Sequence, residues 1–464
     1  MQLPGEHASK YCVSVIRLNM PTMFSTRALA QSLFSAAITA ADPAYAIQQQ
    51  LTRQGDELVV GSWRLNLARC KRVVVIGAGK ASARMASAVE KLLGDRIDAG
   101  VVVVKYGHSE TLSRIRQYEA AHPVPDEAGV AGVAAIEQAV LGLGADDLVI
   151  ACWSGGASAL LPAPHVGLTL ADKQAVTQAL LASGADIAVV NAVRKHCSRL
   201  KGGQLARLIA PARVLCLAVS DVVGDDLATI GSGPFVADPT TFIAVQEHLT
   251  RYQVAVPAAV RKLIADGIAG RVPETPKAND PCFKHVHHHL VASNAQAIAA
   301  IAEQARVAGY EPVVWQQPLI GEARAAGATF AAAAVRSLDN KKRICIIAGG
   351  ETTVTLGDKP GKGGRNQEFA LAAAGMLSAT RWLGQPAPIT ILAAGTDGTD
   401  GPTDAAGAIA DGTTKQRGDA AGVDLEQHLN QHNAYPYFKA IGDLIITGAT
   451  GTNVMDVNIA LVSP

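Results

Sequence analysis

Residues 73–82 read VVVIGAGKAS, a run of apolar side chains that ends in a glycine-rich turn. A helix-spaced stretch, ARMASAVEKLL, follows at residues 83–93, and a second apolar run, VVVV, occupies residues 101–104. Near-continuous apolar strands separated by a helix are typical of a parallel sheet covered on both faces. The stretch therefore predicts a βαβ unit.

The same pattern recurs along the chain. Residues 147–161 read DLVIACWSGGASALL, residues 214–226 read VLCLAVSDVVGDD, and residues 388–395 read PITILAAG. In open α/β sheets the ligand lies beyond the carboxyl ends of the strands. We predict an α/β protein with two open α/β domains, the N-terminal one Rossmann-like, and an active site in the inter-domain cleft.

The domain boundaries follow from a Pro- and Asp-rich segment, VPETPKANDPC, which favours a linker at residues 271–284. We expect an N-terminal domain at 24–270, opening with a helix over 24–50, and a C-terminal domain at 285–464. Residues 1–23 lack the apolar region and cleavage site of a signal peptide. They are expected to form a disordered extension.

The composition argues against several partners. The chain has 41 basic and 40 acidic residues and a net charge of +1, which excludes a footprint for nucleic acid or an anionic membrane. No apolar run approaches the roughly 18 residues of a transmembrane helix. The seven scattered cysteines show no CxxC spacing, which favours reduced, buried thiols in a cytoplasmic protein. A small molecule is the expected partner, and a homodimer stays open.

Two glycine-rich turns suit a phosphate group. In the first, Gly77, Gly79 and Ser82 surround Lys80 at the start of a helix, whose free N–H groups attract anions. The turn resembles a dinucleotide fingerprint, but Ser82 replaces its third glycine and Lys105 ends the next strand, where a ribose-binding acid is expected. A plain strand-to-helix turn is the alternative.

The second turn, WSGGAS, offers a backbone anion cradle made by four residues, with a tight turn capped by serines as the alternative. These four are Ser154, Gly155, Gly156 and Ser158. In NAVRKHCSRLKGG, which begins at Asn191, helical spacing would bring Arg194 and Lys201 onto one face. That pair suits a carboxylate or phosphate, although a solvated basic face fits as well.

Acidic residues and one arginine occur in the remaining glycine-rich loops. Asp221 and Asp225 are suited to Mg²⁺ or to capping, and Asp397 lies among glycines without the spacing of a calcium loop. Gly363 and Gly364 precede Arg365, whose planar charge suits phosphoryl transfer. The run HVHHH at 285–289 looks like a metal site, but no nearby cysteine or acid completes a set. Together the loops favour a nucleoside triphosphate, a metal ion and an acidic substrate.

The order of these motifs resembles the glycerate 2-kinase family, the two-domain type whose C-terminal part is the MOFRL domain. The motifs are GAGKAS, WSGGASALL, NAVRKHCSRLKGG, SDVVGDD with GSGP, GGETTVT with GGRNQE, GTDGTDG and TGATGTN, and the resemblance covers residues 24–461. It implies phosphorylation of D-glycerate to 2-phosphoglycerate with ATP and Mg²⁺. Members have often been labelled hydroxypyruvate reductase.

The resemblance also implies site residues. The family's catalytic lysine matches Lys80, and its catalytic arginine matches Arg365. The glycine-rich turns would bind phosphate, and Asn191, Arg194 and Lys201 would bind substrate. Four acids are candidates for the metal ligands or for the base that accepts the hydroxyl proton: Asp221, Asp225, Glu351 and Asp397.

Two other functions remain open. One is an NAD(P)H-dependent hydroxypyruvate reductase, in which Lys105 would bind a 2′-phosphate. The other is a non-catalytic protein that senses phosphate ligands, although the helix-turn-helix or interaction tail typical of such regulators is not evident in the sequence.

Overall fold

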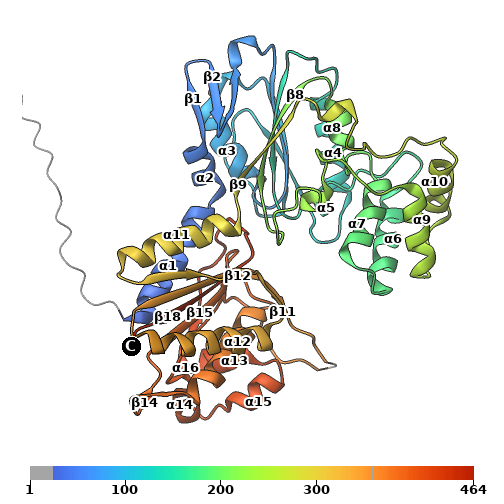
Figure 1. Ribbon diagram of the computed structural model, residues 1–464. Helices are drawn as coiled ribbons and strands as arrows, with labels where there is room; N and C mark the ends of the chain where they lie inside the picture. Colours follow the sequence, from blue (N-terminus) through green and yellow to red (C-terminus); the bar gives the residue numbers. More distant parts are fainter. Residues whose placement is uncertain (1–24, 358) are drawn as a thin grey trace, which may run out of the picture.

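The computed structural model describes residues 25–357 and 359–464, which form two lobes (Figure 1). The predicted extension at 1–23 lies outside the described residues. The N-terminal lobe is built on a six-stranded sheet in the order β6-β5-β4-β7-β8-β9, with every neighbouring pair parallel. This is the strand order of doubly wound nucleotide-binding sheets, in which the order reverses at the ligand crevice. Here the reversal lies between β4 and β7.

The bounds of this sheet are β4 (Val73–Ala78), β5 (Ala99–Lys105), β6 (Arg116–Ala120), β7 (Leu148–Trp153), β8 (Arg213–Val219) and β9 (Val286–Ala292). Its helices include α2 (Pro43–Gln50), α3 (Ser82–Leu93), α4 (Glu127–Ala139), α5 (Ala157–Leu160) and α8 (Gln204–Ile209). Successive side chains of β4 alternate between two cores: Val73 and Val75 pack with α3, and Val74 and Ile76 pack with α4. A strand buried on both faces has to be apolar throughout, which explains the sequence pattern.

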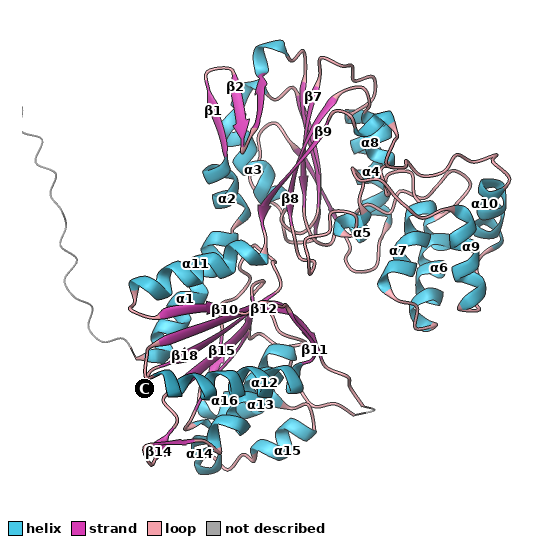
Figure 2. Cartoon of the chain, viewed as in Figure 1, coloured by secondary structure: helices cyan, strands magenta, loops and turns pink. Residues whose placement is uncertain are grey.

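Two parts of this lobe were not predicted. A small antiparallel sheet of β1 (Leu51–Gln54), β2 (Glu57–Val60) and β3 (Trp63–Asn66) precedes the main sheet. Four helices form a projection with a core of its own, visible beside α4 and α5 (Figure 2). They are α6 (Leu170–Ala182), α7 (Ile187–His196), α9 (Phe242–Arg251) and α10 (Ala258–Ile268).

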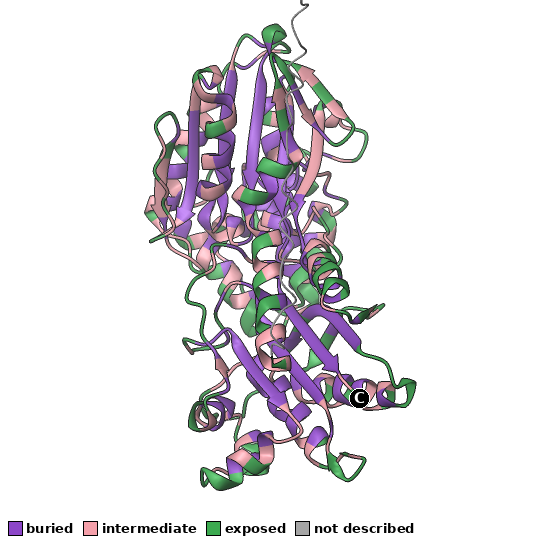
Figure 3. Ribbon diagram, turned by 90° about the vertical axis from the view of Figure 1, so that its left-hand side faces the viewer, coloured by how far each residue is buried: buried purple, intermediate pink, exposed green. Residues whose placement is uncertain are grey.

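The C-terminal lobe holds a seven-stranded mixed sheet with the order β10-β12-β18-β15-β16-β17, in which β11 also pairs with β12. Its strands are β10 (Glu311–Val314), β11 (Leu319–Glu322), β12 (Ile344–Thr353), β15 (Ile389–Gly395), β16 (Gly407–Asp411), β17 (Leu444–Ile445) and β18 (Asp456–Val462). The short strands β13 (Arg381–Trp382) and β14 (Gln385–Pro386) pair separately. The central strands of both sheets are buried (Figure 3).

Helices cover both faces of the second sheet. One face carries α12 (Ala323–Arg336) and α13 (Arg365–Ser378), followed by α14 (Thr414–Ala420), α15 (Leu425–Asn430) and α16 (Ala434–Ile441). The other face carries α1 (Thr26–Ala41) and α11 (Asn294–Val307). Because β18 runs antiparallel to β12 and β15, the loop before β18 lies at the same edge as the loops that follow those two strands. Three glycine-rich loops therefore meet there.

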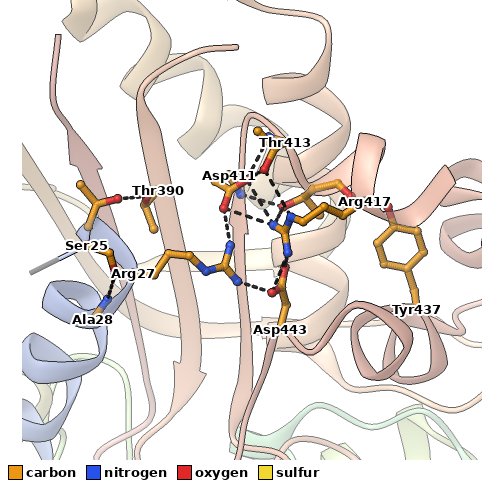
Figure 4. Close-up of polar contacts among 11 residues, drawn as sticks. Ser25, Arg27, Ala28, Thr390, Asp411, Thr413, Arg417, Tyr437 and Asp443 are labelled. Carbon is orange, nitrogen blue, oxygen red and sulfur yellow. Dashed lines mark hydrogen bonds and ion pairs between the residues drawn. The ribbon is translucent and has the colours of Figure 1, made fainter. Parts of the chain in front are cut away.

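The assignment of residues 26–41 to the N-terminal domain is wrong, because α1 packs on the C-terminal lobe. It packs against α11, β15 and β18. Arg27 forms ion pairs with Asp411 and Asp443, and Arg417 donates to Asp443 at 2.7 and 2.8 Å (Figure 4). The helix predicted over 24–50 is divided at Asp42, whose side chain caps α2 through the backbone N–H of Tyr45 at 2.8 Å. The chain thus enters the N-terminal lobe only after α1.

The boundary predicted at residue 285 is also wrong. Strand β9 pairs with β8 and completes the first sheet. The supposed linker at 271–284 packs on the N-terminal lobe, where Thr275 donates to Asp238 at 3.0 Å and Asp280 accepts from Arg207 at 2.8 Å. The prolines and aspartates of this segment belong to an irregular stretch that packs on the lobe. Composition alone does not distinguish such a stretch from a linker.

The structure bears on two features of the composition. Within residues 25–357 and 359–464, no helix combines the length and apolar character needed to cross a membrane. Six cysteines are buried free thiols: Cys70, Cys152, Cys197, Cys216, Cys282 and Cys345. Burial raises the pKa of Cys216 to about 12, as expected for an inert thiol.

Candidate active site

Two glycine-rich turns interlock at the point where the strand order reverses. Gly79 follows β4 with a φ of +134°, and a Cβ there would lie 2.1 Å from Ser154 Oγ. The backbone N–H of Ala81 donates to Ser154 Oγ at 3.0 Å, and that of Lys80 donates to the Gly155 carbonyl at 2.9 Å. Only glycine allows this approach, so the first turn positions the second.

We expect Gly79→Ala to lower the free energy of unfolding by about 2–3 kcal/mol, because it adds a clash to a strained backbone conformation. Urea denaturation would measure the change. Gly55→Ala is the matched control, since Gly55 also has a positive φ (+61°), but a methyl group there would meet no described atom within 4 Å. An equal loss in both variants would contradict the interlocking role.

Lys80 and Asp221 flank the second turn. A Cβ on Gly156 would lie 3.3 Å from Lys80 Cγ, and one on Gly155 would lie 1.8 Å from Asp221 Oδ2. Burial raises the pKa of Asp221, and the positive charge of Lys80 opposes the rise. His122 follows β6, and a Cβ on Gly156 would lie 3.2 Å from its Cδ2. Burial and then the Lys80 charge lower the pKa of His122 to about 4. A lysine, a carboxylate and a neutral imidazole therefore surround the backbone of Gly155 and Gly156, which carry no side chains.

Arg365 is the first residue of α13 in the other lobe. Its guanidinium donates to Asp456 through Nε at 2.6 Å and through a terminal nitrogen at 2.9 Å. A third nitrogen lies 3.1 Å from Glu351 Oε1. Asp456 is buried at the start of β18, so the arginine is fixed by a bidentate pair. Burial opposes the Arg365 charge, but the bonds with Asp456 prevail and raise its pKa.

Asp400 fixes the helix that carries Arg365. It is buried and accepts backbone N–H bonds from Asn366 at 3.0 Å and from Gln367 at 2.8 Å. These are free donors at the N-terminus of α13, since its N-cap, Gly364, has no capping side chain. Burial raises the pKa of Asp400 to about 6 despite the two bonds. Asp400 therefore takes the place of an N-cap side chain.

A cleft of about 240 Å³ lies between the lobes. Lys80, Lys105 and Gly155 line it from the N-terminal lobe, and Asp397 and Asn453 line it from the C-terminal lobe. Burial raises the pKa of Glu351; the charge of Arg365 opposes the rise, and those of Asp456, Asp221 and Asp397 add to it. Carboxylates from both lobes are therefore close enough at the cleft to influence one another's pKa.

A larger cavity of about 390 Å³ lies between the first sheet and helices α6 and α7. Its lining includes Asn191, Arg194, Lys201 and Ser158. The helix predicted to carry both Arg194 and Lys201 ends at His196, so the second residue reaches the cavity from the following loop. Gly155 lines this cavity and the inter-lobe cleft. The two spaces meet at the second glycine turn.

Several predicted site residues have other surroundings. Gly77 lies inside β4, and a Cβ there would be 2.7 Å from the Cys152 carbonyl. Ser82 is fully buried and donates to that carbonyl at 2.8 Å. Both join the glycine turns to the sheet and face neither cavity. Ser154 Oγ faces the first turn, and Gly363 packs near Ala434.

The predicted metal ligands are only partly brought together. Asp225 lines a separate cavity with Asn294 and Trp315, and Glu351 is paired with Arg365. Within the described part of the chain, no three acidic, histidine or cysteine side chains are grouped as a metal site. In the histidine run, His287 stacks on Trp63 at 5.7 Å and the ring of His289 bonds Gln50 at 2.8 Å. The run serves packing.

Sequence reasoning missed three residues at the site. Asp456 holds Arg365, and His122 and Lys173 line the larger cavity. His122 stands just after β6, so its position at a strand end was an available signal. Lys173 is a single lysine within a helix, and no local pattern distinguishes it from a surface residue.

Comparisons with known proteins cover both lobes. Residues 29–265 match a family described as a domain of unknown function (DUF4147), and residues 344–456 match the MOFRL family. The chain is 41% identical to a glycerate 2-kinase of Pyrococcus horikoshii over 94% of this chain and 97% of that one. The chain belongs to the glycerate 2-kinase family.

Two further relatives support this membership. A crystal structure of a glycerate kinase from Thermotoga maritima superposes with a TM-score of 0.83 at 37% identity, covering 94% of this chain and 99% of that chain. A relative from Agrobacterium vitis, 42% identical over 94% of this chain and 95% of its own length, carries a hydroxypyruvate reductase name. The two names coexist within the family.

Proposed function

We propose that the protein is a kinase that transfers the γ-phosphoryl group of ATP to the 2-hydroxyl of D-glycerate, giving 2-phosphoglycerate and ADP. One observation carries the proposal: Gly155, flanked by Lys80 and Asp221, joins a cavity lined by basic side chains to a cleft that also contains Asp397. Phosphoryl transfer requires mainly positioning and neutralisation of phosphate charge. The kinase names of the relatives agree with this chemistry.

Each charged group has a proposed role. Lys80 and Arg365 neutralise the transferred phosphoryl group from opposite lobes. Four residues bind phosphate at the two turns, namely Gly79, Gly155, Gly156 and Ser158. Gly363 and Gly364, which precede Arg365, are proposed to bind phosphate from the other lobe. Asp221 accepts the proton of the attacking hydroxyl, because desolvation makes its carboxylate more basic.

Mg²⁺ fits the carboxylates at the cleft. Mg²⁺ commonly uses one or two carboxylates together with substrate phosphates and water, so a site with three protein ligands is not required. Asp397 lines the cleft, and only one of its oxygens accepts from Thr399. Asp397 would hold the ion with Asp221 nearby. Mg²⁺ bound with ATP would neutralise phosphate charge.

A coupled assay tests the proposal. The protein is incubated with ATP, Mg²⁺ and D-glycerate, and we expect ADP to form only when all three are present. The product is identified by ³¹P NMR, which separates 2-phosphoglycerate from 3-phosphoglycerate. Consumption of NADPH with hydroxypyruvate, without ADP formation, would favour the reductase, with Lys105 near the nucleotide. Binding of phosphate compounds without turnover would favour the sensor. Cytoplasmic location and a homodimer remain predictions.

A further inference from the structure

Three exposed apolar side chains surround the mouth of the larger cavity. Val124 is 54% exposed in the loop between β6 and α4, Leu181 is 57% exposed near the end of α6, and Ile187 is 60% exposed at the start of α7. All three line the cavity. Apolar side chains gathered around a pocket are typical of a ligand-binding surface.

Hydrogen bonds hold the elements that carry these three side chains. The side-chain amide of Gln174, in α6, donates to the Pro125 carbonyl at 2.7 Å, which joins this helix to the loop that carries Val124. Asp186 caps the start of α7 through the backbone N–H of Val189 at 2.9 Å. The apolar residues therefore stand on restrained elements on both sides of the opening.

Basic side chains line the floor of the same cavity, where burial lowers the pKa of Lys173 to about 8 and, with the charges of Lys173 and Arg194, lowers that of Lys201 further. Lys173 and Lys201 are buried, and their ammonium groups donate to backbone carbonyls: Lys173 to Cys197, and Lys201 to Ser158 and Leu161. Arg194 also lines the cavity, and burial lowers its pKa without an opposing acid among the described residues. Among those residues, Asp221 is the one carboxylate in the lining of this cavity. Buried basic side chains without acidic partners favour a bound polyanion.

The combination of an apolar mouth and a basic floor selects a ligand with two different ends. D-glycerate carries an oxygen on each carbon and has no apolar part to place at the mouth. A nucleoside triphosphate has a flat base at one end and a polyanion at the other. The volume of about 390 Å³ lies in the range of pockets that bind ligands larger than glycerate.

We infer that the base of ATP lies between Val124, Leu181 and Ile187, and that its phosphates extend over Lys173, Arg194 and Lys201 toward Gly155. This inference rests on the proposed kinase function and assigns its two substrates to two spaces. The γ-phosphoryl group reaches the junction of the cavities, and glycerate occupies the inter-lobe cleft beside Lys80 and Lys105. Arg194 and Lys201 then hold phosphates and not the glycerate carboxylate.

The double variant Leu181→Ser/Ile187→Ser tests the position of the base. Both side chains are exposed, so the fold is expected to persist. Loss of their apolar contact should raise the Kd of ADP and the KM of ATP about tenfold or more. The KM of D-glycerate and the Kd of inorganic tripolyphosphate, which has no base, should stay within about twofold. Ile243→Ser, 56% exposed on α9 outside the cavity, is the matched control.

Lys173→Met tests the phosphate path. We expect this variant to raise the Kd of ADP and the Kd of tripolyphosphate alike, about tenfold, without changing the KM of D-glycerate. Unchanged ADP binding in the double variant, or a raised KM for glycerate alone, would overturn the inference while leaving the kinase function intact. A wild-type protein that binds no nucleotide and forms no ADP would instead overturn the proposed function itself.

Discussion

Lys80→Ala is expected to lower turnover with ATP and D-glycerate by at least about 10²-fold, the scale of losing one group that stabilises developing charge. The ammonium group is positioned by the interlocked turns, with the lysine side chain over Gly156 and its backbone N–H on the Gly155 carbonyl. Nothing else in this turn carries a positive charge. The loss should therefore fall mainly on kcat.

Steady-state kinetics and a nucleotide-binding titration would separate this effect from a change in binding. Lys91→Ala is the matched control, because Lys91 lies exposed on α3, which begins just after Lys80. The Lys91→Ala variant should have the wild-type kcat. If Lys80→Ala kept wild-type turnover, Lys80 would be removed from the reaction.

Arg365→Ala should cause a second loss of about 10²-fold or more in turnover. It should also destabilise the fold by about 1–3 kcal/mol, because it leaves the buried carboxylate of Asp456 without its bidentate partner. Arg365→Lys should restore little activity, since a lysine cannot bond Asp456 twice and still reach Glu351.

The double variant Arg365→Ala/Asp456→Ala separates the two effects. Removing both partners should recover part of the stability, measured by urea denaturation, because no buried carboxylate is left unpaired. Turnover should stay at the low level of Arg365→Ala. Recovery of turnover together with stability would mean that Arg365 acts only through the fold.

Local patterns predicted the first sheet well. The apolar strands and glycine turns at 73–82 and 147–161 lie where the sequence indicated, because a strand buried on both faces leaves a continuous apolar run. The meeting of Asp221 with Gly155 was not predictable, since they follow different strands and only the strand order makes them neighbours. The role of Asp456 depends on β18 running antiparallel to β12.

The domain boundaries failed for a related reason. Helix α1 has an ordinary amphipathic pattern, and nothing local shows that its apolar face is complementary to a sheet formed near the other end of the chain. The larger cavity was likewise not predictable, because α6 and α7, which line it, belong to a projection that the strand pattern does not mark.

The placement of α1 bears on how the chain folds as it leaves the ribosome. The N-terminal lobe has all its strands once β9 has emerged, so it can fold while synthesis continues. Helix α1 is made before the strands of the N-terminal lobe, but β15 and β18, on which it packs, are made after them. During that interval its apolar face has no sheet to cover and stays exposed, and transiently exposed apolar surface is prone to aggregation. The C-terminal lobe therefore incorporates a helix made before the N-terminal lobe, and it can do so only after β18 is released.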